Sequence, residues 1–158
     1  NSISTIPPYS LVSDSFRNYQ AMRDMGGRRV DRSILVDVNS IRFLSPEEIE
    51  LLRQKGRLEG IAAEKIEHAI NVQLLRYALE HFLTHDARVN HKMLTMVRQM
   101  APTATGLPLQ LYFFTRCTGW KDYEHTLSDI MDHVYALTRE FGITMFQSPA
   151  GTDLKSLK

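Results

Sequence analysis

Hydrophobic positions alternate with polar ones in some stretches of the chain and recur every three or four residues in others. In residues 32–38 (RSILVDV), Ile34, Val36 and Val38 share one face of a strand, with residues 40–44 as a candidate extension. Two more strand-like runs, residues 91–102 and 107–117, flank the turn-rich PTATG, which is the spacing of a hairpin. A short strand over residues 143–149, ending at Pro149, completes a set of four expected strands.

Three helices are expected between these strands. Residues 45–56 carry Ser45 as N-cap, Pro46 at the first helical position, Glu48 for a capping box and Gly56 as the stop. Residues 57–70 are weakly helical and lead into a helix over residues 71–86. Its apolar stripe is Val72, Leu75, Ala78, Leu79, Phe82 and Leu83. The helix over residues 120–142 ends at Gly142 and carries Tyr123, Leu127, Ile130, Val134, Leu137 and Phe141.

The order of these elements predicts an α+β fold for residues 28–150. Setting aside a helical insertion at about residues 45–70, the order is that of a ferredoxin-like βαββαβ domain, whose two helices lie on one face of the sheet. Each of these two helices has a single apolar stripe, as that layer arrangement requires. Many unrelated functions share this fold, so the fold alone does not indicate the activity.

Residues 1–27 read as an appendage to this domain plus a linker. Residues 4–19 (STIPPYSLVSDSFRNY) contain two short alternating pieces, yet no strand partner for them precedes Arg28. The best linker candidate is residues 22–32 around Gly26 and Gly27, with the boundary near Gly27. We therefore expect the chain to be a piece of something longer, and we expect residues 151–158 to be a frayed tail.

Composition bounds the function classes. The chain has 158 residues, of which 43% are hydrophobic, and 19 basic against 18 acidic residues give a net charge of +1. This charge gives no argument for nucleic acid or an anionic membrane surface as a partner, and we predict no nucleic-acid partner. No run approaches the roughly 18 to 20 apolar residues of a spanning helix. The single cysteine, Cys117, fits a reducing compartment. The aromatic run at residues 112–114 lacks the basic-Gly-aromatic pattern of RNA-recognition domains, and no phosphate-binding glycine motif occurs.

Candidate chemistry is sparse. His81 and His85 lie one helical turn apart, but no complementary Cys or His pair completes a metal site. A second group, beside Glu124 and His125, contains Asp129, Asp132 and His133, which fall on the polar side of their helix. We interpret both groups as solvated side chains and predict no catalytic residue, no metal and no cofactor. A metalloenzyme that uses these residues stays open as a third hypothesis.

Several stretches, taken in order, resemble the cytoplasmic part of MscS-type mechanosensitive ion channels, most closely the miniconductance (YbdG-like) branch. These are ISTIPPYSLVSDSFRNY, GGRRVDRSILVDVNSIRFL, LTMVRQMAPTATGLPLQLYFFT and EFGITMFQSPAGTDLKSL. The resemblance implies that residues 1–27 contain the last strands of an Sm-like β-barrel. The matching barrel-end residues are Ile6, Pro7, Ser13, Phe16 and Asn18.

The resemblance also implies a function. Such a chain would be the cytoplasmic vestibule domain of a channel in the bacterial inner membrane, assembled as a homoheptamer and attached to the membrane only through upstream helices. It would open under membrane tension, release solutes in hypoosmotic shock and catalyse no reaction. Arg28, Arg29 and Arg32 form a basic neighbourhood with Arg17 and Arg23 upstream, which is usually a solvated face; on this resemblance Arg28, Arg29 and Arg32 would line the vestibule.

The carboxyl-terminal tail departs from the family pattern, and one alternative function stays open. Some family members close the vestibule with a further carboxyl-terminal strand, whereas GTDLKSLK shows no strand pattern. The runner-up hypothesis is a ferredoxin-like regulatory module that binds a small molecule, which a pocket between the helix layer and the sheet would favour.

Overall fold

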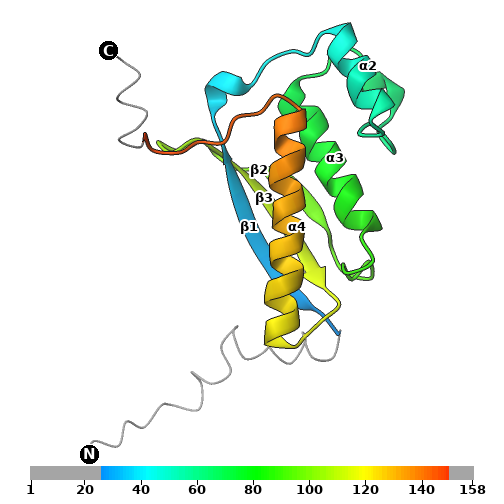
Figure 1. Ribbon diagram of the computed structural model, residues 1–158, viewed down its shortest axis with the longest axis vertical. Coiled ribbons are helices and arrows are strands. Elements are labelled where there is room, and N and C mark those ends of the chain that lie inside the picture. The colour runs from blue at the N-terminus through cyan, green and yellow to red at the C-terminus, as the bar shows by residue number, and fades with distance from the viewer. Residues whose placement is uncertain (1–25, 150–158) are drawn as a thin grey trace, which may run out of the picture.

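Residues 26–149 are those that the structure, a computed structural model, describes. Three antiparallel strands form one sheet in the order β1-β3-β2: β1 (Arg28–Val36), β2 (Met96–Gln99) and β3 (Leu107–Thr115). Its three α-helices are α2 (Pro46–Gln54), α3 (Asn71–His85) and α4 (Trp120–Glu140). Figure 1 shows α3 and α4 side by side over the sheet, with α2 at one end. The described part is therefore a small α+β domain, and the barrel-end residues and the tail from residue 151 lie outside it.

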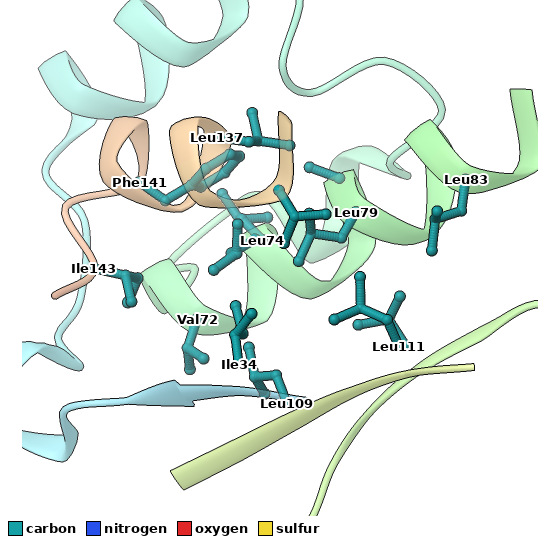
Figure 2. Close-up of a cluster of buried hydrophobic side chains, with 14 of the residues drawn as sticks. Ile34, Val72, Leu74, Leu79, Leu83, Leu109, Leu111, Leu137, Phe141 and Ile143 are labelled. Atoms are coloured by element: carbon teal, nitrogen blue, oxygen red, sulfur yellow. The ribbon is translucent and has the colours of Figure 1, made fainter. Parts of the chain in front are cut away.

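The apolar stripes expected on both long helices form the core, which confirms them. Leu75, Leu79 and Leu83 of α3 are fully buried, as are Ile130 and Val134 of α4. They pack with the strand residues Val30, Ile34, Val36, Leu109, Leu111 and Phe113, which alternate onto the same face of the sheet. In Figure 2 these apolar side chains fill the space between the helices and the strands. Burial of this apolar surface is the main stabilising contribution.

The first strand differs from the one expected at residues 32–38. It begins at Arg28, directly after the buried Gly27, because Arg28 already pairs with Thr115 in the register of β3. It ends at Val36 because the Asp37 side chain accepts the Asn39 N–H and starts a 3-10 turn at Val38–Ser40. The candidate extension over residues 40–44 was wrong.

The capped helix was correct in its boundaries. Ser45 Oγ accepts the Glu48 N–H at 3.3 Å, and the Glu48 carboxylate accepts the Ser45 N–H at 2.9 Å, so the capping box is complete. Glu48 also receives two hydrogen bonds from Arg42. Hydrogen bonds from Arg42 and from the Ser45 backbone lower the pKa of Glu48 to about 2.

The segment between α2 and α3 was read as weakly helical, and this was wrong. It contains one 3-10 turn, Ala63–Lys65, and is followed by the buried Asn71 at the start of α3. The Asn71 side chain accepts the N–H of Arg42 at 3.0 Å and of Val72 at 2.9 Å, and donates to the carbonyl of Ser40 at 2.8 Å. This amide thus joins the loop after β1 to α3 and satisfies backbone groups that would otherwise be buried without partners.

The hairpin expected between residues 91 and 117 is present as β2 and β3. Its turn needs Gly106, which has a φ of +106° and where a Cβ would stand 2.7 Å from the Val36 carbonyl oxygen. The last expected strand is reduced to one bridge, Val36 with Met145. Beside it, the Asp37 N–H donates to Thr144 O at 2.9 Å and the Phe146 N–H donates to Leu35 O at 2.8 Å. The chain therefore returns to the edge of β1 that faces away from β3.

Candidate functional site

The three arginines singled out in the sequence lie on β1 but on two different faces of the sheet. Side chains alternate along a strand, so Arg28 and Arg32 share the face of Val30, which is packed against the helices. Arg29 lies on the opposite face, which no helix among residues 26–149 covers in Figure 1. The arginines therefore do not form a single patch.

Arg28 is anchored on α4. Its guanidinium lies 4.3 Å from the centre of the Tyr123 ring, and the Tyr123 hydroxyl donates to the Arg29 carbonyl oxygen at 3.3 Å. Burial raises the pKa of Tyr123, and the positive charge of Arg28 opposes part of that rise. This contact joins the beginning of α4 to the beginning of β1 and leaves Arg29 and Arg32 as the exposed cations of the strand.

The open face of the sheet carries a row of polar side chains. Gln110 of β3 donates to Asp31 of β1 at 2.7 Å and accepts from Arg98 of β2 at 2.5 Å. Next to this row, the rings of Tyr112 and Phe114 meet edge to face at 5.6 Å. The alternation of side chains along β3 places Gln110, Tyr112 and Phe114 on this face, opposite the buried Leu109, Leu111 and Phe113.

His81, His85 and His133 lie around a hollow of about 300 Å³. His85 and His133 are exposed, as the sequence analysis expected, and His81 is half-buried. The ring centres of His81 and His85 on α3 lie 4.0 Å apart with the rings tilted, and His133 of α4 stacks on Phe82, also at 4.0 Å. The remaining lining residues are Gly56, Arg57, Ala78, Asp86 and Leu137. The sequence analysis treated the two histidine groups separately. The predicted fold class places the two long helices side by side, and this packing was the signal that the groups could be neighbours.

Two ion pairs frame this hollow. Arg57 donates to both carboxylate oxygens of Glu140, at 2.8 and 3.2 Å, and lowers the pKa of that carboxyl. Arg88 donates to both oxygens of Asp86, at 2.9 and 2.6 Å, and lowers the pKa of Asp86 in the same way. These contacts tie the segment after α2 to α4 and fix the end of α3.

Metal chemistry receives no support in the described part of the chain. Among residues 26–149, no three His, Cys, Asp or Glu side chains are grouped so that they could hold a metal ion. Asp129 and Asp132 are exposed on α4, as their positions off the apolar stripe predicted. Cys117 is half-buried, and its thiol lies 3.7 Å from the Thr126 hydroxyl.

Comparison with models of known protein families gave no match for this chain. Within residues 26–149, no helix has the length and the apolar character needed to cross a membrane.

Proposed function

We propose that this chain is a cytoplasmic vestibule domain of an MscS-type mechanosensitive channel. The channel opens under membrane tension and releases solutes in hypoosmotic shock. The proposal rests on the four stretches that resemble these channels in order along the chain. The domain makes or breaks no bond; its task is to hold subunits in a closed ring, a homoheptamer, on the cytoplasmic side of a bacterial inner membrane.

The return of residues 144–146 to the free edge of β1 supports the fold that this proposal requires. A ferredoxin-like sheet has its fourth strand beside the first, and the hydrogen bonds from Asp37 to Thr144 and from Phe146 to Leu35 occupy that place. Together with the order β1-β3-β2 and with α3 and α4 on one face, this supports the ferredoxin-like plan as the finer fold. β3 and residues 144–146, which lie on either side of β1, each belong to another of the resembling stretches.

The exposed arginines give the domain a means to affect permeation. Arg29 faces the open side of the sheet and Arg32 the helix side, so whichever side lines the vestibule carries a cation of β1. A ring of subunits repeats that charge once per subunit.

The coding sequence upstream of Asn1 is the direct test of this assignment. The proposal expects several apolar helices followed by a β-rich stretch that completes the barrel. A start codon immediately before Asn1 contradicts it, because residues 1–27 would then have no domain to complete.

A small-molecule-binding regulatory module is the second candidate function. The hollow between α3 and α4 favours it, although neither this hollow nor the one beside Gly60 and Tyr77 is lined by a strand residue. A metabolite that shifts the melting temperature, in a chain whose upstream sequence encodes no membrane helices, would favour this module over the channel.

A further inference from the structure

The hollow between α3, α4 and the segment after α2 combines features of an anion site. We propose that it binds a small phosphate-type oxyanion when its histidines, His81, His85 and His133, are protonated. This inference stands apart from the channel proposal, because it depends only on side chains within the described domain.

The ring nitrogens of these histidines are available to a ligand. His85 Nδ1 lies 2.8 Å from the His81 carbonyl oxygen, which only accepts hydrogen bonds, so this nitrogen carries the proton and Nε2 is left for a ligand. Among residues 26–149, neither ring nitrogen of His81 or His133 has a hydrogen-bond partner. A protonated imidazole offers a donor at each nitrogen.

The carboxylates around the hollow are already neutralised by arginines. Arg88 holds Asp86 and Arg57 holds Glu140, each through two hydrogen bonds. No carboxylate among residues 26–149 lies within 4.0 Å of a nitrogen of His81, His85 or His133. The charged groups near the three histidines are Asp86 and Glu140, which interact electrostatically with His133, Arg57, which lines the same hollow, and Lys65 and Glu80, which line an adjacent hollow together with His81.

Protonation of His133 adds positive charge beside Asp86 and Glu140, each of which is already paired with an arginine. Histidine is the side chain whose charge is most readily switched near neutral pH, so the pH of the solution is the variable that tests the role of this charge. Because the ring centres of His81 and His85 lie 4.0 Å apart, two protons on that pair repel each other unless an anion lies beside them. Anion binding and proton uptake are thus coupled, and each favours the other.

The shape fits a small oxyanion better than a flat carboxylate. Residues with N–H donors line the hollow from three segments: His81 and His85 on α3, His133 on α4, and Arg57 after α2. A tetrahedral oxyanion presents acceptors in several directions at once, whereas a carboxylate presents two in one plane. The volume of about 300 Å³ is at the lower end of that of ligand sites, so a phosphate group with a small substituent also fits.

The chain contains its own matched control, because it has six histidines and three of them lie outside the hollow. Isothermal titration calorimetry measures the binding of inorganic phosphate and of sulfate to the 158-residue chain at pH 5.5 and at pH 8.0. Sulfate is included because its charge is the same at both pH values. We expect affinity at least tenfold higher at pH 5.5. The triple variant His81→Gln/His85→Gln/His133→Gln should lose this binding, and His68→Gln/His91→Gln/His125→Gln should keep it.

Equal loss in both triple variants, equal affinity at the two pH values, or no binding to the wild type would overturn the proposal. Proton NMR of the wild-type imidazole rings gives a readout that needs no variant: phosphate should shift the resonances of His81, His85 and His133 and leave the others in place. Vesicles of phosphatidylglycerol distinguish the source of the phosphate. Histidine-dependent co-sedimentation at pH 5.5 assigns a lipid headgroup, and its absence, with phosphate bound, assigns a free phosphate compound.

Discussion

The carboxylate of Glu80 on α3 accepts the backbone N–H of Val97 on β2 at 3.0 Å. Val97 stands opposite Leu111 at a position where its N–H points away from β3, so this donor lies on the outer edge of the sheet. An open edge invites pairing with another chain, and a charged side chain that caps it prevents this. Helix and sheet are thus joined by a polar contact as well as by the core.

Replacing Glu80 with Ala should destabilise the domain by about 1 to 2 kcal/mol, because a hydrogen bond to a charged group is lost and the N–H is left without its partner. Denaturant unfolding measures the loss, and hydrogen exchange should show faster exchange at the Val97 amide. Glu64→Ala, at an exposed position of the 3-10 turn, is the control and should change neither. Unchanged Val97 exchange in Glu80→Ala would show that the contact does not hold the edge.

Asn71→Ala should be more costly, about 3 kcal/mol. The Asn71 side chain is fully buried, and its loss leaves the N–H groups of Arg42 and Val72 and the carbonyl of Ser40 without this partner. Thermal and urea unfolding give the difference. Asn39→Ala removes an exposed amide that donates to Asp37, and it should cost under about 0.5 kcal/mol. Similar losses in the two variants would show that the hydrogen bonds of Asn71 do not stabilise the domain.

Acid should weaken the Arg42–Glu48 contact over a defined pH range. The folded-state pKa of Glu48 is about 2, below the value of about 4.3 of a free glutamate. The contribution of the ionised Glu48 to the free energy of unfolding is therefore present above about pH 4.5 and is lost as the pH falls toward 2. Glu48→Gln should therefore be less stable than the wild type at pH 6, with the two converging near pH 2. Because the side chain is largely exposed, the difference should be about 1 kcal/mol or less.

Unfolding curves at several pH values check this, and the Arg42→Gln background gives the control. There the same Glu48→Gln change should have a smaller pH-dependent effect, because the largest cause of the shift is already gone. A difference between wild type and Glu48→Gln that persists unchanged to pH 2 would show that the carboxylate is not stabilised in the folded state.

Local signals in the sequence identified the features that depend on neighbouring residues. Ser45, Pro46 and Gly56 fixed α2, and apolar spacing identified the buried faces of α3 and α4. The early start of β1 was missed because Arg28 and Arg32 stand where an alternating pattern would show apolar residues. These cations are tolerated because the inward face of the strand reaches the edge of the helix layer there, where Arg28 covers Tyr123.

Features that depend on distant residues were not visible in the sequence. The Asn71 clamp joins residues about 30 positions apart, and nothing in an NVQLL stretch indicates that its amide is buried. The hollow required His133 to be placed beside His81 and His85, which depends on how α3 and α4 pack along each other. In both cases tertiary packing, rather than local spacing, sets the environment of the side chain.

The channel proposal predicts that neutralising arginines on β1 shifts the ion preference of the assembled protein toward cations. Arg29 and Arg32 lie on opposite faces of the sheet, so the single variants Arg29→Gln and Arg32→Gln each neutralise one face. We expect one of these two variants to account for most of the shift in ion preference that the triple variant Arg28→Gln/Arg29→Gln/Arg32→Gln shows. Reversal potentials in asymmetric salt give the measurement. Arg53→Gln on the exposed side of α2 is the control, and an unchanged preference in the triple variant removes the proposed role.

The most direct test of the channel assignment is electrical. The complete reading frame that contains this chain is expressed in bacteria that lack their own tension-gated channels, and excised membrane patches are stretched by suction. The account predicts stepwise currents that appear with suction and are absent from patches without the protein, together with better survival of osmotic downshock. Protein present in the membrane with no current at any tension that the patch withstands would contradict it.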